Sequence, residues 1–167
     1  MLKYVDTKIV FQEIPNEITL CINLSNCPCH CEGCHSSYLA EDIGIVLDRK
    51  ELFHLLKINR GITAVCFMGG DAEPYQVLTL AREIKEDLKY KDLKVGWYSG
   101  RDKLPAGIEL NLQNFDYIKL GPYIKERGPL NCKTTNQKMY KIKYNSDSDT
   151  YYTEDITYKF QKYENKN

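Results

Sequence analysis

The segment Ile62-Thr63-Ala64-Val65-Cys66-Phe67-Met68 decides the fold, because it is a near-continuous apolar run of strand length. Such a run is typical of a strand buried on both faces, as the strands of parallel sheets are. Gly69-Gly70 follows directly and lets the chain turn sharply. The segment therefore predicts a central strand of a parallel sheet that is covered on both sides.

A helix is predicted on each side of this strand. Asp48 and Glu51 form a capping box for the first helix, and Gly61 is expected to stop it. Its apolar face consists of Leu52, Phe53, Leu55 and Leu56. The second helix follows the glycines, and its apolar residues recur at helical spacing: Val77, Leu80, Ala81, Ile84 and Leu88.

Three further segments are predicted as strands, at Ile18–Leu24, Leu93–Tyr98 and Phe115–Leu120. Strands that alternate with helices imply parallel pairing through right-handed crossovers. A complete eight-fold barrel takes about 250 residues, so a chain of 167 residues can form only part of one. We therefore expect an α/β fold with an open, partial parallel βα barrel.

The polar and cysteine-containing motifs all follow predicted strands. A cysteine-rich loop follows Ile18–Leu24, Gly69-Gly70-Asp71 follows the central strand, and Ser99-Gly100 follows Leu93–Tyr98. In parallel sheets the carboxyl ends of the strands form the edge where ligands bind. We expect one site at this edge.

The cysteine loop reads Cys27-Pro28-Cys29-His30-Cys31-Glu32-Gly33-Cys34-His35. Three of its cysteines have the spacing Cys27-x3-Cys31-x2-Cys34. Three thiolates so close in sequence must lie on one loop, where they can bind one shared group. This arrangement suits an iron–sulfur cluster that leaves one iron free for a substrate or cofactor, whereas a fourth cysteine completes the cluster in ferredoxins. Cys29 lies between these ligands and is expected not to bind the cluster.

The cysteine spacing resembles the signature of the radical S-adenosylmethionine superfamily. The longer sequence pattern Cys-Pro-x-x-Cys-x-Gly-Cys-His resembles that of the activating proteins of anaerobic ribonucleotide reductases. Three more segments agree with that family, and the resemblance covers roughly residues 8 to 142. The three segments are Met68–Pro74, Tyr98–Gly100 and Thr135–Lys138.

The resemblance implies a partial barrel of the radical S-adenosylmethionine type over residues 1–142. It implies that Cys27, Cys31 and Cys34 hold a [4Fe–4S] cluster whose fourth iron binds S-adenosylmethionine. Reductive cleavage of this cofactor would give a 5′-deoxyadenosyl radical, which takes a hydrogen atom from a backbone glycine of the anaerobic ribonucleotide reductase. The reductase would be one partner, and an electron donor such as flavodoxin or ferredoxin the other. No side chain is expected to act as a general acid or base.

The same resemblance assigns Gly69, Gly70 and Asp71 to the amino group of the cofactor's methionine. Two glycines at a strand end allow the backbone to approach a ligand closely, and they serve an ordinary strand-to-helix turn equally well. Many relatives have glutamate at the position of Asp71.

Three other residues are assigned to the cofactor. Gly33 stands where many relatives have an aromatic residue beside the adenine, so contact there would come from the backbone. Ser99 is a candidate for hydrogen bonding to a ribose hydroxyl, or a turn residue. His35 is a candidate for contact with the cofactor or with the reductant, or a cap of the segment that follows.

Two alternatives to an activating protein remain. The deazaguanine-forming enzymes are equally compact and act on a small molecule, but they share only the cluster motif with this chain. A zinc-stabilised binding module is the second alternative. Structural zinc sites usually have two separated ligand pairs, whereas Cys66 stands alone in an apolar run and Cys132 is farther along.

Other uses of the cysteines are not expected. A redox pair of Cys31 and Cys34 would require a helix that starts directly after a strand. The crowded residues that precede Cys31 argue against such a start. Seven cysteines is an odd number, which argues against a disulfide framework. Cys21 and Cys66 lie within predicted strands, where we expect them to be small core residues.

Composition excludes several classes of protein. Lys plus Arg and Asp plus Glu each number 23, so the chain lacks the basic field of a nucleic-acid-binding protein. No apolar stretch approaches the 18 or so residues of a membrane-spanning helix. Met1–Asp6 lacks the apolar region of a signal peptide. We expect a cytoplasmic protein.

The C-terminal residues 143–167 are expected to form an extension and not a separate domain. Tyr140, Ile142 and Tyr144 alternate with polar residues, and residues 145–149 read as a turn. Residues 156–160 alternate again, which predicts a β-hairpin or an added edge strand. The polar residues 162–167 are expected to fray.

Overall fold

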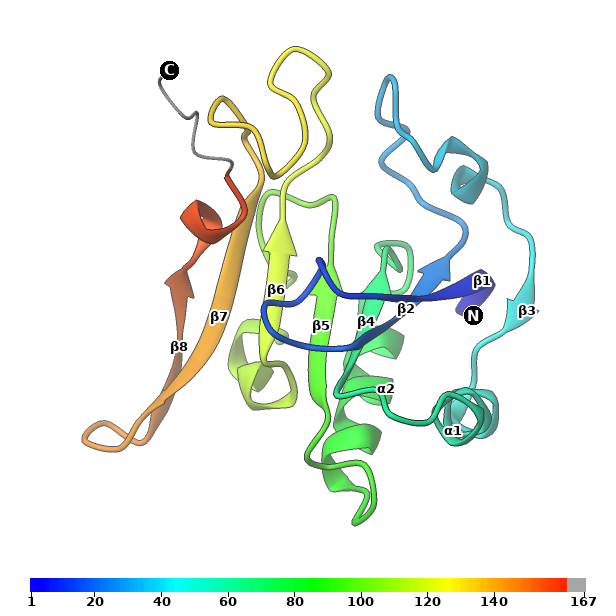
Figure 1. Cartoon of the computed structure of the whole chain (residues 1–167), viewed down its shortest axis with the longest axis vertical. Helices are drawn as coiled ribbons and strands as arrows, with labels where there is room; N and C mark the ends of the chain where they lie inside the picture. The colour runs from blue at the N-terminus through cyan, green and yellow to red at the C-terminus, as the bar shows by residue number, and fades with distance from the viewer. Residues whose placement is uncertain (162–167) are drawn as a thin grey trace.

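The computed structural model describes residues 1–161, so the expectation for residues 162–167 lies outside the described residues. Within residues 1–161 the chain forms one sheet of eight strands in the order β3-β1-β2-β4-β5-β6-β7-β8 (Figure 1). The strands are β1 (Lys3–Val10), β2 (Thr19–Leu24), β3 (Ile45–Val46), β4 (Ala64–Met68), β5 (Lys94–Tyr98), β6 (Tyr117–Leu120), β7 (Lys138–Asn145) and β8 (Thr150–Asp155).

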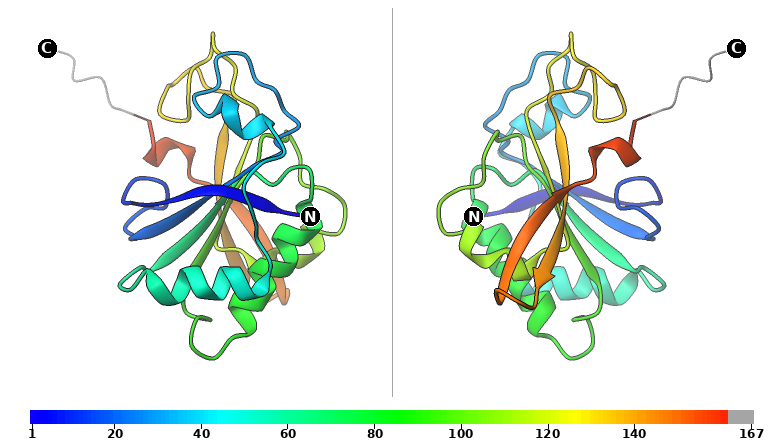
Figure 2. Two further views of the ribbon diagram at one scale, coloured as in Figure 1. Left: turned by 90° about the vertical axis from the view of Figure 1, so that its right-hand side faces the viewer. Right: turned by 90° about the vertical axis from the view of Figure 1, so that its left-hand side faces the viewer.

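The middle of the sheet is parallel and its two flanks are antiparallel. β2, β4, β5 and β6 pair in parallel, and Cys66 of β4 lies between Cys21 of β2 and Gly96 of β5. β1 and β3 extend one side and β7 and β8 the other, all with antiparallel pairing. The sheet is twisted and does not close into a barrel (Figure 2). The predicted α/β class and open sheet are confirmed; the strand at Lys3–Val10 was not predicted.

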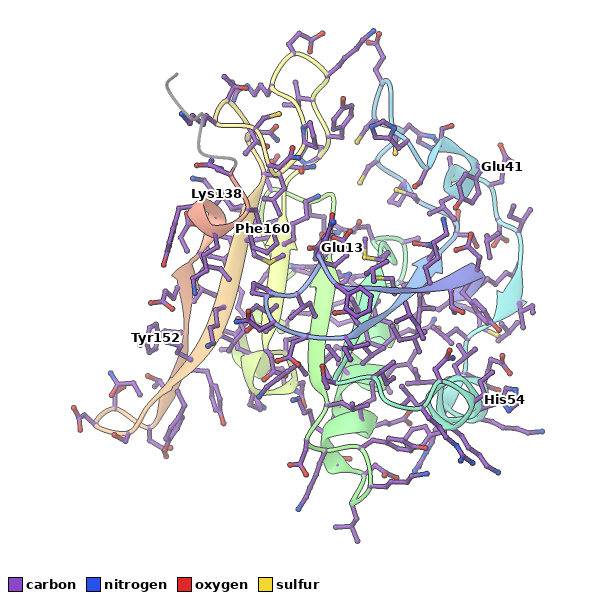
Figure 3. All side chains as sticks on the ribbon, viewed as in Figure 1. Glu13, Glu41, His54, Lys138, Tyr152 and Phe160 are labelled. Carbon is purple, nitrogen blue, oxygen red and sulfur yellow. The ribbon has the colours of Figure 1, made fainter. Side chains whose placement is uncertain are left out.

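Helices α1 (Arg49–Ile58) and α2 (Pro74–Glu86) cover one face of the parallel strands, which we call the outer face. The predicted cap of α1 is present, because the backbone N–H of Glu51 donates to Asp48 Oδ1 over 2.8 Å. His54 lies on the exposed side of α1 (Figure 3). The predicted apolar residues of the two helices are buried, apart from Leu88 and the partly buried Phe53, and Pro74 at the start of α2 is buried in addition.

The prediction that Leu88 continues the face of α2 is wrong. The helix ends at Glu86, and Leu88 is 86% exposed. Asp87 causes the break, because its backbone is extended and its carboxylate accepts the backbone N–H groups of Lys89 and Tyr90. A side chain that bonds to nearby backbone in this way competes with the helix.

The connection between β5 and β6 also departs from simple alternation. It contains the 3-10 segment η2 (Glu109–Asn114), which is kinked at Asn111, in the place where a full helix would follow β5. Leu112 and Phe115 from this connection are buried, and the Trp97 ring stacks on Phe115 with ring centres 6.0 Å apart. This compact connection therefore covers the outer face beside β5.

The opposite face of the sheet, the inner face, has its own small core. It comprises Ile14, Cys21, Ala64, Cys66, Tyr117, Met139 and Ile156. Ile14 belongs to the loop between β1 and β2, which crosses in front of the parallel strands with Glu13 beside it (Figure 3). Its side chain is fully buried, and a Cβ atom on Gly96 would lie only 2.7 Å from Ile14 Cδ1. Gly96 therefore makes room for this loop.

The predicted hairpin is present, with a shifted second strand. β7 and β8 pair over six residue pairs around the predicted turn. The prediction that residues 156–160 form the second strand is wrong: β8 ends at Asp155, and a 3-10 turn, η3 (Thr157–Lys159), follows. Asp155 Oδ1 accepts the backbone N–H of Thr157 over 2.9 Å, which turns the chain out of the strand. Residue 143, the expected start of the extension, lies inside β7.

The burial of Ile14 yields a prediction about stability. Replacing Ile14 by alanine should lower the free energy of unfolding by about 2–5 kcal/mol, because it opens a cavity in the inner core. Ile43→Ala is the matched control, because this loop isoleucine is 45% exposed and should change stability by less than about 0.5 kcal/mol. Urea unfolding measures both values. Equal effects of the two substitutions would show that the loop does not close the inner face.

Candidate functional site

A cavity of about 270 Å³ lies at the carboxyl ends of the parallel strands. Its wall combines the cysteine loop with the residues that follow β4, β5 and β6, so the predicted motifs meet at one place. The strand-end residues in the wall include Met68, Gly69, Asp71, Tyr98, Ser99, Gly100, Lys119 and Gly121. Parallel strands that end at one edge bring these segments together although they are far apart in the sequence.

The cysteine loop is held in place by its backbone. The N–H of Asn26 donates to the carbonyl of Glu41 and that of Cys27 to the carbonyl of Leu39, both over 2.9 Å. These bonds tie the loop to η1 (Ser37–Ala40) and the residue after it. Asn26, His30 and Gly33 all have positive φ, so the loop bends tightly three times.

All four thiols of the loop line this cavity: Cys27, Cys29, Cys31 and Cys34. Within residues 1–161, however, no three His, Cys, Asp or Glu side chains form a group that could hold a metal ion. The donor atoms are thus of the right kind and in one cavity, which suits an iron–sulfur cluster. Binding a cluster would require the thiols to turn toward one another.

Cys29, the thiol of the loop that was not assigned to the cluster, packs against a carboxylate. Its Sγ lies 4.0 Å from Asp71 Oδ2, and a Cβ atom on Gly100 would come within 2.5 Å of it. Burial, the Asp71 carboxylate and the Cys27 thiol raise the pKa of Cys29 to about 12. Cys29 therefore packs as a protonated thiol against the ends of β4 and β5.

The two glycines after β4 have different surroundings, although both have positive φ (97° for Gly69 and 87° for Gly70). Gly69 lines the cavity. A Cβ atom on Gly70 would instead lie 2.7 Å from Val77 Cγ2 and 2.8 Å from Leu24 Cδ1. The structure thus brings Gly69 to the candidate site and turns Gly70 toward the core under α2.

Asp71 is the centre of a hydrogen-bond network between β4 and β5. Its carboxylate is 1% exposed, accepts the Ser99 hydroxyl over 2.5 Å and accepts the Gly100 N–H over 2.9 Å. Arg101 donates to the Asp71 carbonyl over 2.6 Å. The Ser99 hydroxyl also accepts the N–H of Arg101 over 3.1 Å. Asp71 and Ser99 are therefore engaged with each other and fix the shape of the cavity wall.

The other two predicted residues face the loop that follows β6. A Cβ atom on Gly33 would lie 3.7 Å from Tyr123 Cε1 and 3.6 Å from Lys125 Cδ, so the two loops touch there. His35 lines the cavity, and its ring centre is 6.2 Å from that of Tyr123. Tyr123 was not singled out from the sequence, because the loop that carries it has no strong motif.

Lys119 is the second residue of the site that the sequence did not reveal. Its side chain lies in the cavity wall, with Nζ 3.3 Å from the Gly121 carbonyl and 5.8 Å from the centre of the Tyr98 ring. Burial lowers the pKa of Lys119, although Asp71 and Cys31 oppose this effect. The sequence feature that could have revealed Lys119 is its position between Ile118 and Leu120, at the end of an apolar strand. A half-buried cation in a cavity wall can receive an anionic group.

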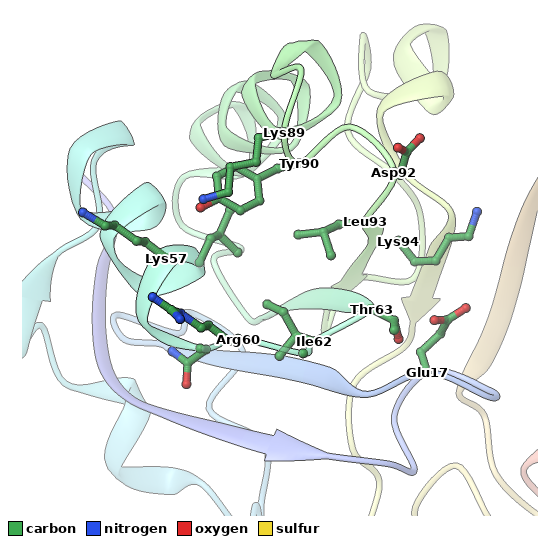
Figure 4. Close-up of a pocket in the computed structure, with 13 residues that line it drawn as sticks. Glu17, Lys57, Arg60, Ile62, Thr63, Lys89, Tyr90, Asp92, Leu93 and Lys94 are labelled. Atoms are coloured by element: carbon green, nitrogen blue, oxygen red, sulfur yellow. The ribbon is translucent and has the colours of Figure 1, made fainter.

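A larger cavity of about 590 Å³ lies at the opposite end of the strands, below α1 and α2 (Figure 4). Long charged side chains surround it, among them Lys57, Arg60 and Lys89 on one side and Glu17 and Asp92 on the other. It contains none of the motifs singled out from the sequence. The smaller cavity combines four thiols with a half-buried lysine, and we take it as the candidate site.

Comparison with known protein families, with curated proteins and with solved structures found no match to this chain. Among residues 1–161, no helix has both the length and the apolar character needed to span a membrane. The function must therefore be argued from the site itself.

The glycine geometry gives a prediction that separates backbone strain from packing. Gly61 has φ +82°, and a Cβ atom added to it would meet no described atom within 4 Å, whereas Gly70 has φ +87° and two close core neighbours. Gly61→Ala should lower the free energy of unfolding by about 1–2 kcal/mol through strain alone. Gly70→Ala should cost about 1–3 kcal/mol more, because it overpacks the core. Urea unfolding of both variants tests this; equal losses would contradict the placement of Gly70.

Proposed function

We propose that this protein is a cytoplasmic radical S-adenosylmethionine activase that generates a glycyl radical on an anaerobic ribonucleotide reductase. The observation that carries the proposal is the meeting of four thiols from one short loop with the ends of three parallel strands around one cavity. The cysteine spacing and the three agreeing segments support it further. In this proposal the open sheet is a partial barrel of the radical S-adenosylmethionine type.

Cys27, Cys31 and Cys34 would hold the [4Fe–4S] cluster, and Cys29 would remain against Asp71. When bound, the cluster and S-adenosylmethionine together supply a 5′-deoxyadenosyl radical that can take a hydrogen atom from a glycine. The protein supplies placement and a cavity with little water. No general acid or base is required of its side chains.

Gly69 lines the cavity and has no side chain. Within residues 1–161 its carbonyl accepts only the indole N–H of Trp97, so its second lone pair would be offered to the amino group of the methionyl part of the cofactor. Lys119 would attract the carboxylate of the same part, since its half-buried side chain lies in the cavity wall. Asp71 and Ser99 would hold these groups in position and would not touch the cofactor, because their oxygen atoms already bond to each other and to the backbone.

The access route supports a protein substrate. Two loops rise above the strand ends, one with the cysteines and one after β6 (Figure 1). They touch at Gly33 and Lys125. A loop of the reductase would have to bring its glycine to the cavity between them, because hydrogen transfer requires the reacting atoms to approach to roughly 3–3.5 Å. The electron donor, such as flavodoxin or ferredoxin, would approach the cysteine loop, where His35 is a candidate contact.

The cluster assignment predicts which cysteines are needed. Cys27→Ser, Cys31→Ser and Cys34→Ser should each prevent anaerobic reconstitution of a four-iron cluster, because a site with three thiolates has none to spare. Cys29→Ser and the control Cys132→Ser should keep iron content and the brown iron–sulfur absorption near those of the unaltered protein. Iron analysis and ultraviolet–visible spectra measure this.

Two results would overturn the assignment. Loss of the cluster in Cys29→Ser, with retention in one of the other three, would change the ligand set. Stoichiometric zinc without iron–sulfur absorption in the unaltered protein would instead favour a zinc-stabilised binding module.

The partner assignment has its own test. The reduced protein, supplied with S-adenosylmethionine and the anaerobic ribonucleotide reductase of its own organism, should produce the doublet of a glycyl radical in electron paramagnetic resonance. A reductase whose radical-site glycine is replaced by alanine is the control and should give no doublet. Cofactor cleavage that never yields the doublet would favour a small-molecule substrate, as in the deazaguanine-forming enzymes.

A further inference from the structure

β8 forms one free edge of the sheet, and its residues are unusually exposed. Five of its six residues are exposed and Glu154 is half-buried. The opposite edge consists of β3, which has only two residues, and of the part of β1 that β3 does not cover. The pairing of β1 with β2 is irregular between Tyr4 and Asp6, whereas β8 pairs regularly over its whole length, so β8 is the more regular of the two edges for another strand to pair with.

The pairing of β7 shows which groups of β8 face outward. The N–H of Ile142 donates to Asp116 on the β6 side, and the carbonyl of Met139 accepts from Ile156 on the β8 side. The side to which a residue's N–H and carbonyl groups point alternates along a strand. The backbone groups of Lys141 and Lys143 therefore point toward β8, and those of their partners Glu154 and Tyr152 point toward β7. The residues between these partners present their N–H and carbonyl groups to solvent: Tyr151, Thr153 and Asp155.

This edge lacks most of the features that usually block strand addition, and its only charged residues are Glu154 and Asp155. Residues 150–155 include neither proline nor lysine, and their register with β7 is regular over all six pairs. Natural edge strands are commonly protected by lysine, proline, a bulge or short length. Residues 150–155 therefore leave the backbone of the edge open to pairing with another strand.

The sequence of the edge is complementary to itself. In an antiparallel pair centred on Thr153, Tyr151 lies opposite Asp155 of the second copy and Tyr152 lies opposite Glu154. No carboxylate residue then lies opposite another carboxylate residue, and each lies opposite a tyrosine instead. Opposite like charges would destabilise such a pair. In this register the outward-facing residues of one copy meet the outward-facing residues of the other, as a ladder of hydrogen bonds requires.

The surrounding charges and rings also favour a second copy. Lys143 pairs with Glu154 over 2.9 Å and Lys138 with Asp155 over 3.5 Å, so the acidic end of β8 is neutralised within each chain. The whole chain has zero net charge, which leaves little repulsion between copies. Tyr144 and Tyr151, with ring centres 5.1 Å apart, are each about half exposed. They provide apolar surface beside the ladder.

We propose that two copies of this chain form a two-fold dimer by antiparallel pairing of their β8 strands, with Thr153 opposite Thr153 at the axis. The two sheets then become one continuous sheet. β8 lies at the far end of the sheet from β2, which leads into the cysteine loop (Figure 1). The dimer therefore leaves both candidate sites accessible, and it is independent of the proposed activity.

Sedimentation velocity of the full chain tests the dimer, and the expected mass is twice the 19.4 kDa of one chain. Thr153→Pro removes an outward N–H and leaves the ladder with β7 intact, because proline is tolerated on the solvent side of an edge strand. It should raise the dissociation constant of the dimer by roughly tenfold or more. Thr153→Val is the matched control, since it keeps the N–H and the branched side chain, and it should remain a dimer.

Thr153→Lys provides a second variant in case the proline disturbs folding. It places two ammonium groups opposite each other at the axis and should also give monomers, with an unchanged circular dichroism spectrum. A chain that is monomeric at every concentration tested would overturn the proposal, because the β8 edge would then not pair with a second copy. A dimer unaffected by both Thr153→Pro and Thr153→Lys would overturn it too.

Discussion

Parallel pairing of β2, β4, β5 and β6 is the constraint on which the rest of this structure depends. Each of these strands runs in the same direction, so each must deliver the segment that follows it to the same edge of the sheet. The cysteine loop, Gly69, Ser99 and Lys119 therefore meet around one cavity, although nearly a hundred residues separate the first from the last. The helices and the 3-10 segment between the strands are the crossovers that parallel pairing demands.

The Asp71 carboxylate ties this edge together. A buried charge is costly unless it is well hydrogen-bonded, and Asp71 meets this requirement through Ser99 and the backbone of Gly100. The network joins the ends of β4 and β5 and gives Cys29 a surface to pack on. Asp71 and Ser99, which the sequence suggested as cofactor contacts, are thus engaged in holding the wall of the cavity in one shape.

The antiparallel flanks explain why the sheet stays open. β1 and β7 reverse direction on either side of the parallel strands, and no further crossover within residues 1–161 continues the sheet toward closure. The inner face is filled instead by the loop that carries Ile14. The open sheet also leaves β8 with a single neighbouring strand among residues 1–161.

The sequence by itself determined the alternation of strands and helices, the capped start of α1, and the position of each motif directly after a strand. These follow from local periodicity and from single capping residues, which act within a few positions of the chain. Only the tertiary structure decided that Gly69 and not Gly70 lines the cavity, that Asp71 bonds to Ser99, and that Lys119 lies in the cavity wall. Those outcomes depend on how the backbone and side chain of each residue are oriented relative to strands that are distant in sequence, which no local pattern encodes.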